Sequence, residues 1–375
     1  MSVWTDVAAG GSPAGPVGPV GLLQRDIASG RIAHAYVFAG VAGRVPVETA
    51  LAFSAALVCP KSGCGECEVC ARVKHRAHPD VEVIEPAGMQ LLVEQVREAI
   101  RSASRRPVAA PRRVIIVDGA DRMNPNAQNA FLKALEEPPA STTIVLLAPS
   151  PEALLETVRS RCREVTFHSP PAAEVSALLE RRGISPEDAR YCARVGGGLE
   201  RAMSLASDAD TRGLRDELVD RVARPLSDPG EALEAAEWLA GKTKEIRERV
   251  AADRRAADAA YADWYRETKR TADERVRREQ RRAEQDALEA AVDDVASVLR
   301  DLLAVRRDEG ADVLNESARA ALVERAARLG PTSAADARVV ACLTEVERCR
   351  RRLRANANVL LTLEGLFLSL YRYLS

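Results

Sequence analysis

The stretch Arg112-Arg-Val-Ile-Ile-Val-Asp118 decides the fold of the first half of the chain. Its four consecutive β-branched residues, followed by an aspartate, predict a strand that is buried on both faces. Similar apolar runs occur at 33–40 and 142–148, and shorter strands are expected at 80–84 and 164–167. Strands that are apolar throughout, instead of alternating with polar residues, are typical of a parallel sheet.

Helical patterns separate these strands. They cover Ala50–Val58, Val93–Ser102 and Asn126–Glu137, and the last is stopped by two prolines. Alternating strands and helices predict an α/β domain, a parallel sheet with helices on both faces, over residues 22–168. After that point the strands stop, and we expect a small helical domain at 169–207 and an all-helical region at 208–375.

Composition limits the possible functions. The chain has 375 residues, with 54 Lys and Arg against 55 Asp and Glu, so its net charge is −1. No overall field attracts nucleic acid or an anionic membrane. The glycine- and proline-rich segment 1–21 resembles no secretory signal and is expected to be flexible. Apolar runs are shorter than the roughly 20 residues of a membrane span. We therefore expect a cytoplasmic protein with no membrane contact.

Four of the eight cysteines fall within twelve residues, at Cys59, Cys64, Cys67 and Cys70. Glycines at 63 and 65 make this loop tight enough for the thiols to converge. Four thiolates suit a tetrahedral Zn²⁺ with no open coordination position, so the site would be structural. An iron–sulfur cluster is one alternative, and replacement of one thiolate by His75 or His78 is another. The other cysteines, Cys162, Cys192, Cys342 and Cys349, are expected to be ordinary buried thiols.

The segment after the first strand has the position of a phosphate-binding loop but lacks its chemistry. Such a loop needs two glycines, a lysine for the phosphates and a Ser or Thr for Mg²⁺. With Gly40 as the first glycine and Gly43 inside the loop, the second glycine is replaced by Val45, the lysine by Pro46 and the hydroxyl by Val47. Pro46 removes both the cation and a backbone N–H. We expect this degenerate loop to bind no nucleotide.

The acidic motif of an ATPase is degenerate as well. The central strand ends in Asp118-Gly119, whereas an active enzyme of this type would carry a glutamate at position 119 to orient the attacking water. Two losses far apart in the sequence both indicate an inert site.

A charged segment interrupts the helical region. Residues 242–286 hold 14 Lys or Arg and 11 Asp or Glu. The pattern favours a long solvated helix or a helical hairpin with ion pairs four residues apart. The alternative is a nucleic-acid contact through the arginine-rich stretch 275–282.

These motifs together resemble the delta-prime subunits of the bacterial DNA polymerase III clamp loader, a family that is similar to AAA+ ATPases. The resemblance is dense over about 17–207 and thin beyond it. Besides the four-cysteine insert, it is carried by His34–Gly40, Val114–Met123, Asn129–Pro138, Ser160–Cys162, Gly197–Leu205 and Asn356–Glu364. It implies an AAA+ module with a zinc module at 59–70, a helical lid at 169–207, and a collar at 208–375 that joins subunits into a ring.

The resemblance also assigns a role to Arg161 in the Ser-Arg-Cys motif. In this family that arginine resembles an arginine finger, which reaches the ATP of a neighbouring subunit. A guanidinium supplied across an interface stabilises the charge that develops during phosphoryl transfer. Arg159 is the nearest alternative. Arg201 resembles the sensor-2 arginine of the lid, and without a nucleotide of its own this chain would use it structurally.

The expected function is that of a non-hydrolysing subunit in a DNA-directed DNA polymerase complex, with Zn²⁺ and no nucleotide as cofactor. Its partners would be gamma/tau and delta subunits, and through the assembled complex the sliding clamp and primed DNA. Two alternatives are an active, gamma/tau-like AAA+ ATPase and a zinc-dependent DNA-binding module. The residues at 46, 47 and 119 argue against the first, and the near-neutral charge argues against the second.

Overall fold

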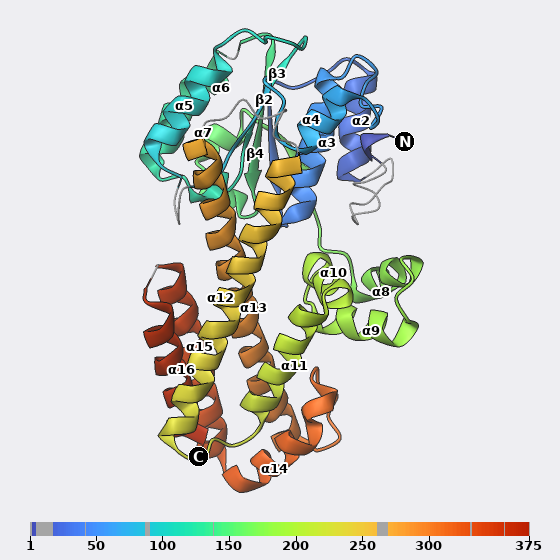
Figure 1. Ribbon diagram of the computed structural model, residues 1–375. Coiled ribbons are helices and arrows are strands. Elements are labelled where there is room, and N and C mark those ends of the chain that lie inside the picture. The colour runs from blue at the N-terminus through green and yellow to red at the C-terminus, as the bar shows by residue number, and fades with distance from the viewer. Residues whose placement is uncertain are drawn as a thin grey trace. The chain divides into compact units, whose positions relative to one another are not determined.

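The computed structural model describes residues 2–4, 18–41, 43–86, 91–137, 139–260, 269–330, 332–355 and 357–374. These residues form two compact units, Met1–Ala202 and Met203–Ser375. The first unit contains the sheet, and the second is helical throughout its described part (Figure 1).

Five parallel strands form one sheet in the order β2-β3-β4-β1-β5. The strands are β1 (Ala35–Ala39), β2 (Val81–Ile84), β3 (Arg113–Val117), β4 (Thr142–Ala148) and β5 (Arg163–Thr166). Every residue of β1, β3 and β4 is buried, because these three strands lie in the centre and are covered on both faces. The predicted parallel sheet and its five strands are confirmed.

Two apolar cores lie on opposite faces of this sheet. Odd-numbered and even-numbered residues of β3 illustrate the division: Val114 and Ile116 belong to one core, Ile115 and Val117 to the other. The first core contains residues of α2 (Pro19–Ala28), α3 (Arg44–Val58) and α4 (Glu68–Lys74). The second contains residues of α5 (Val93–Ala103), α6 (Pro125–Glu136) and α7 (Glu156–Arg159).

Two helix boundaries differ from the sequence-based prediction. Helix α3 begins at Arg44, well before the expected Ala50, because residues 45–47 continue the helix directly from the loop. Helix α2 begins at Pro19, inside the segment expected to be flexible, because proline suits the first position of a helix. Residues 5–17 of that segment lie outside the described residues.

The first unit ends in helices. These are α8 (Ala172–Arg181), α9 (Pro186–Val195) and α10 (Leu199–Ser207), and short 3₁₀ turns at Ala120–Arg122 and Pro151–Ala153 occur earlier in the module. The predicted lid, 169–207, is grouped with the sheet in this unit, except for residues 203–207, which belong to the second unit.

The second unit packs its helices around one apolar core of Leu, Val and Ala side chains. It contains α11 (Ala209–Ala223), α12 (Pro229–Ala260), α13 (Lys269–Arg307), α14 (Arg319–Leu329), α15 (Ser333–Arg354), α16 (Val359–Leu374) and a 3₁₀ turn at Glu316–Ala318. No helix in the described part of the chain is long and apolar enough to span a membrane.

The charged segment 242–286 belongs to a pair of antiparallel helices, α12 and α13. Arg247 forms an ion pair with Glu284 at 3.1 Å, and Arg254 with Glu279 at 3.5 Å. As the residue number rises along α12, from 247 to 254, the number of its partner on α13 falls, from 284 to 279. The two helices are therefore antiparallel. The helical hairpin is therefore confirmed, and charges of opposite sign join its two helices. Residues 261–268, between the helices, lie outside the described residues.

Candidate functional site

The segment 40–47, which the sequence analysis interpreted as a degenerate phosphate loop, follows β1 at the carboxyl edge of the sheet. Gly40 has φ +102°, and an added Cβ would lie 2.1 Å from the Phe167 carbonyl oxygen, so only glycine fits there. Gly43 has φ +106° and caps α3. Val45, Pro46 and Val47 form the first turn of α3, with Val47 6% exposed. A strand, a loop and a helix thus follow one another in the order expected of a phosphate site, and Val45, Pro46 and Val47 provide no cation and no hydroxyl.

The acidic motif lies at the same edge, after β3. Gly119 has φ +67°, and an added Cβ would lie 3.1 Å from Pro86 Cγ. A side chain at this position is therefore disfavoured both by the backbone conformation and by its neighbours. Asp118, beside it, donates its backbone N–H to Ile84 at 2.8 Å. The backbone conformation at Gly119 therefore disfavours the glutamate that an active ATPase would carry at this position.

A residue that the sequence analysis missed lies against the loop. An added Cβ at Gly43 would fall 2.0 Å from Glu200 Oε2, so this carboxylate packs directly on the Gly43 α-carbon. The resemblance singled out the next residue, Arg201, as similar to a sensor-2 arginine that this chain would use structurally. The side chain that contacts Gly43 is instead the acidic one, Glu200. No local sequence signal pointed to Glu200, because its contact with Gly43 joins residues that are far apart in the chain.

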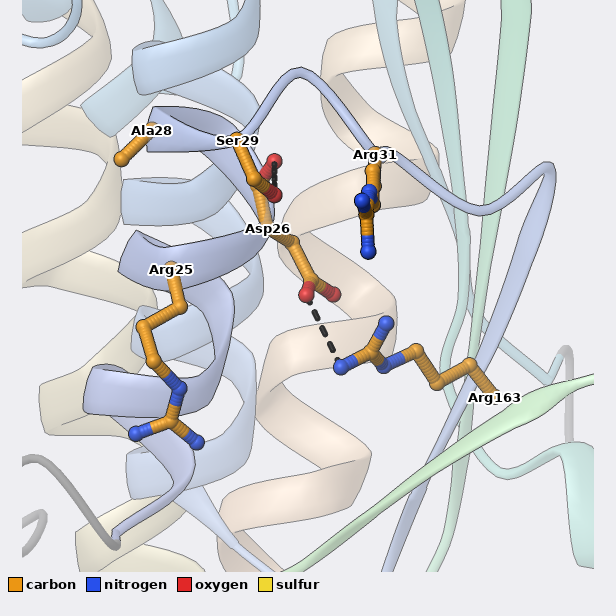
Figure 2. Close-up of a pocket in the computed structure, with 6 residues that line it drawn as sticks. All are labelled: Arg25, Asp26, Ala28, Ser29, Arg31 and Arg163. Atoms are coloured by element: carbon orange, nitrogen blue, oxygen red, sulfur yellow. Dashed lines mark hydrogen bonds and ion pairs between the residues drawn. The ribbon is translucent and has the colours of Figure 1, made fainter.

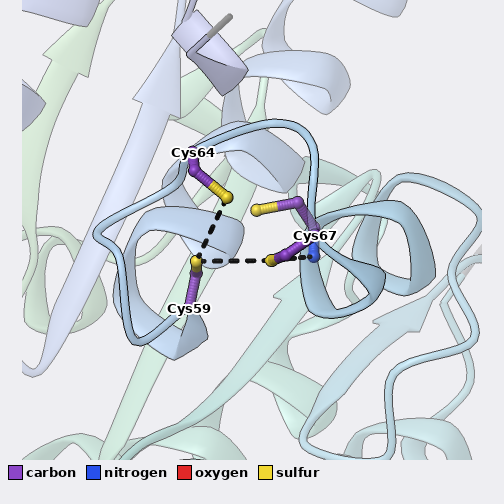
Figure 3. Close-up of side chains that lie close together, drawn as sticks. Cys59, Cys64 and Cys67 are labelled. Atoms are coloured by element: carbon purple, nitrogen blue, oxygen red, sulfur yellow. Dashed lines mark hydrogen bonds between the residues drawn. The ribbon is translucent and has the colours of Figure 1, made fainter.

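The four cysteines converge between α3 and α4. The Sγ atom of Cys59 lies 4.0 Å from that of Cys64 and 3.6 Å from that of Cys67 (Figure 3), and all four sulfurs lie within 4.8 Å of one another. Four thiolates on one zinc ion, each at about 2.3 Å, stand about 3.8 Å apart. The donor set therefore fits a single tetrahedral ion. Gly63 and Gly65, at φ +83° and +82°, make the expected tight loop.

Backbone N–H groups point at three of these sulfurs. Lys61 donates to Cys59 at 3.3 Å, Gly65 to Cys70 at 3.4 Å and Cys70 to Cys67 at 3.5 Å. Burial raises the pKa of Cys59, but such backbone hydrogen bonds together outweigh it and lower that pKa to about 6. Burial raises the pKa of Cys70. Metal binding requires thiolates, and the donated N–H groups stabilise that form.

The alternative metal ligands are not part of this group. Among the described residues, the metal-binding cluster consists of the four cysteines alone. His75 caps the end of α4, and His78 accepts a hydrogen bond from the Asp80 backbone through Nδ1 at 3.1 Å. The iron–sulfur alternative fits less well. In a cluster of four iron atoms each thiolate binds a different iron, so the sulfurs lie farther apart than around a single ion. Of the isolated cysteines, three are buried as expected, whereas Cys162 is half-buried.

Arg161 lies at the opposite edge of the sheet from the phosphate loop. It comes just before β5, whose first residue Arg163 is in register with Tyr36 near the start of β1, whereas Gly40 follows the end of β1. The Arg161 guanidinium donates to the Thr157 carbonyl at 2.8 Å and to Glu136 at 2.8 Å. Arg161 is therefore placed away from the loop of its own chain. Arg159 is paired with Glu164 at 3.6 Å.

A hollow of about 530 Å³ lies beside the start of β5. Figure 2 shows Asp26 and Arg163 pointing toward one another in it, joined at 2.9 Å. The second oxygen of Asp26 accepts from the Tyr36 hydroxyl at 3.0 Å, and burial raises the pKa of Tyr36 to about 12. The hollow is lined by Arg25, Asp26, Ala28, Ser29, Arg31 and Arg163. Because three arginines and one aspartate line the hollow, this edge of the sheet is basic.

Most of the first unit is similar to known proteins. Residues 18–171 match the family model described as DNA polymerase III, delta subunit. The chain is 30% identical over 188 residues to the delta' subunit of Bacillus subtilis, which covers 49% of this chain and 57% of that protein. It is therefore related to the delta-prime subunits of DNA polymerase III. The delta' subunit of Pseudomonas aeruginosa is 36% identical over 155 residues, covering 40% of this chain and 47% of the relative.

Gamma/tau subunits are also similar. That of Mycobacterium tuberculosis (strain H37Rv) is 33% identical over 202 residues, covering 51% of this chain and 34% of that protein. The chain spans about half the length of the curated delta' relatives it matches. The five-stranded parallel sheet with its flanking helices fits the AAA+ fold of clamp-loader subunits, as the delta-prime resemblance predicts.

Proposed function

We propose that this chain is a clamp-loader subunit that does not hydrolyse ATP and that completes the ATP site of a neighbouring subunit with Arg161. The observation that carries the proposal is the placement of Arg161 and the phosphate loop at opposite edges of one sheet. An arginine on the far edge cannot serve the loop of its own chain, but it is available to the loop of a second subunit.

The ion pair with Glu136 is compatible with this role. The side chains of Arg161 and Glu136 are 36% and 50% exposed, and exposed ion pairs contribute at most about 1 kcal/mol. A nucleotide triphosphate carries several negative charges and would compete for the guanidinium at small cost. The hollow lined by Arg25, Arg31 and Arg163 is basic, which supports the proposal that this surface contacts an anionic partner.

The loss of nucleotide binding is the second part of the proposal. Pro46, Val47 and Gly119 stand where a nucleotide site needs a lysine, a hydroxyl and a glutamate. The sequence left two alternatives open. The first, an active ATPase, requires that the isolated chain binds ATP, which this proposal excludes. The zinc-dependent DNA-binding module is disfavoured because the cysteine loop packs into the core of the α/β module.

The third part concerns the metal. We infer that Cys59, Cys64, Cys67 and Cys70 hold Zn²⁺, which would cross-link the end of α3 to α4 and supply no reactive position. The partners in the proposal are ATP-hydrolysing gamma/tau subunits and a delta subunit. The assembled complex would act on the sliding clamp and primed DNA in the bacterial cytoplasm.

The test is ATP hydrolysis by a clamp loader reconstituted from this chain and its host's gamma/tau and delta subunits. Arg161→Ala should lower turnover about 10³-fold or more at the ATP site that Arg161 completes, with assembly unchanged. Arg159→Ala, two residues away, is the matched control and should leave turnover near that of the native complex. Equal turnover of the Arg161→Ala and native complexes would refute the role of Arg161, and a specific loss with Arg159→Ala would transfer it to that residue.

A further inference from the structure

Helix α3 begins without a cap from its own sequence. Its N-cap is Gly43, which has no side chain, and its first turn contains no acidic residue. The first N–H groups of a helix have no partner within the helix, and its N-terminus carries a partial positive charge. A phosphate group satisfies both requirements in a nucleotide-binding loop. Since residues next to α3 provide neither, partners for these N–H groups and a negative charge have to come from elsewhere in the chain.

Glu200 is positioned to meet them. It lies in the first turn of α10, and its Oε2 contacts the α-carbon of the Gly43 N-cap. The preceding turn is tightly packed, because an added Cβ at Gly196 would lie 2.7 Å from the Ala202 backbone nitrogen. This packing fixes the start of α10. The carboxylate of Glu200 therefore lies near the positive ends of two helices, α3 and α10.

We propose that Glu200 takes the place of a nucleotide phosphate at the loop 40–47. Its carboxylate would provide the negative charge at the N-terminus of α3, exclude phosphates from the loop by charge and by volume, and tie α10 to the module without a ligand. In a nucleotide-binding protein, the phosphate contacts this loop only while the nucleotide is bound. In this chain, Glu200 would contact the loop permanently. The inference rests on the proposed loss of nucleotide binding and adds the residue that enforces it.

The first test restores the loop with and without Glu200. One full-length variant carries Val45→Gly, Pro46→Lys and Val47→Thr, and a second carries these changes with Glu200→Gln. Binding of a fluorescent N-methylanthraniloyl ATP with Mg²⁺ is titrated for both. The variant with Glu200→Gln should bind at least about tenfold more tightly, because the carboxylate no longer opposes the phosphates. Equal affinity of the two folded variants would overturn the proposal.

The second test needs no change in the loop and decides the matter if the restored variants do not fold or do not bind. In the native background, Glu200→Gln should speed backbone hydrogen exchange at residues 43–48 and 199–203 about threefold or more. Glu187→Gln is the matched control, since Glu187 is exposed in the first turn of the neighbouring α9. Exchange that is unchanged by Glu200→Gln, or is equally faster in the control, would overturn the proposal.

The proposed function and this inference can fail separately. The turnover of Arg161 variants tests the arginine without reference to Glu200. Unchanged turnover would refute the arginine's role and leave the contact between Glu200 and Gly43 untouched. Equal affinity of the two restored variants would refute the role of Glu200 and leave the arginine's role standing.

Discussion

Asp80 shows how one buried carboxylate organises a loop. Its side chain is fully buried and accepts backbone N–H bonds from Val108 at 2.7 Å, Ala109 at 2.7 Å and Ala110 at 2.9 Å. The Arg113 guanidinium lies 3.7 Å away and compensates the charge. The segment before β3 therefore has a fixed conformation although it lies outside regular structure, because a buried carboxylate must keep its donors.

Replacing Asp80 by asparagine should destabilise the first unit by about 2–3 kcal/mol. Asparagine keeps one acceptor oxygen, so at least one of the three N–H groups loses its partner, and Arg113 keeps only Glu82 of its two carboxylate partners. Urea unfolding followed by circular dichroism measures the change. Glu98→Gln, an exposed site on α5, is the control and should change stability by less than about 0.5 kcal/mol. Similar values for both variants would contradict the account.

At the scale of elements, side chains cap and join the helices of the second unit. Asp208 caps α11, since its carboxylate accepts the Asp210 N–H at 3.1 Å. The same carboxylate pairs with Arg249 of α12 at 2.8 Å. Burial raises the pKa of Asp208, but the hydrogen bonds from Thr211 and the charge of Arg249 outweigh it and hold that pKa below its usual range.

The lowered pKa of Asp208 gives a pH dependence with a definite sign. The charged form is stabilised in the folded state, so its contribution is present above the unfolded pKa of about 4 and is lost as pH falls below it. Asp208→Asn keeps the cap and loses the charge, whereas Asp208→Ala loses both and should cost about 1 kcal/mol at pH 7. Urea unfolding between pH 7 and 3 should show the native advantage over Asp208→Asn shrinking below about pH 4. An advantage independent of pH would contradict it.

The cysteine loop also organises the start of the described chain. Val3 donates its N–H to the Gly63 carbonyl at 3.1 Å, and Val3 and Trp4 pack against Val20 and Ala52. A Cβ at Gly63 would lie 2.7 Å from Val3 Cγ2, so this contact requires the tight loop. The conformation of the loop depends on the convergence of its four thiols, and the contact with Val3 should depend on the metal.

Removing the proposed Zn²⁺ should therefore change the surroundings of Trp4. Chelation is expected to release about one Zn²⁺ per chain and to shift tryptophan emission to longer wavelength as Trp4 gains water contact. Cys64→Ser should give the shifted spectrum without chelator. Trp4→Phe is the control, and its remaining tryptophan emission should not respond. A shift of equal size in Trp4→Phe would show that the emission change does not come from Trp4. An unchanged spectrum of the native chain after release of Zn²⁺ would contradict the dependence of the contact on the metal.

At the scale of the whole molecule, each unit has its own core and its own buried polar network. In the second unit, the side chain of Arg215 is 2% exposed and lies 3.2 Å from Asp294, and it donates to Asn315 at 2.5 Å. Asn315 in turn donates to Asp301 at 2.7 Å. Both ends of this network lie within Met203–Ser375. Damage to it should therefore remain within that unit.

Arg215→Ala should lower the stability of the second unit by about 3–5 kcal/mol, because it breaks the buried ion pair with Asp294 and the hydrogen bond to Asn315. Trp238, which stacks under Arg221 at 4.6 Å, reports on that unit, and Trp4 reports on the first. Unfolding measured in a Trp264→Phe background should show the Trp238 transition moving while the Trp4 transition stays. Equal movement of both transitions would mean that the chain unfolds as one cooperative body.

The sequence by itself determined the features that depend on short spacing. Apolar runs such as Val114–Val117 predicted the parallel strands, and the four cysteines within twelve residues predicted the metal-binding group. The strands and the convergence of the four thiols are confirmed, because both depend on residues that are close along the chain. The boundaries of α2 and α3 were less accurate, since helix ends depend on how the neighbouring loop packs.

Only the tertiary structure decided which distant residues meet. It brought Glu200, which the sequence analysis did not single out, to Gly43, and it set Arg161 against Glu136 at the edge of the sheet away from the loop 40–47. It also showed that the ion pairs of the charged segment join two helices, as between Arg247 and Glu284. Local pattern contains no information on such pairs, because the packing of whole helices and strands fixes the distance between side chains far apart in the chain.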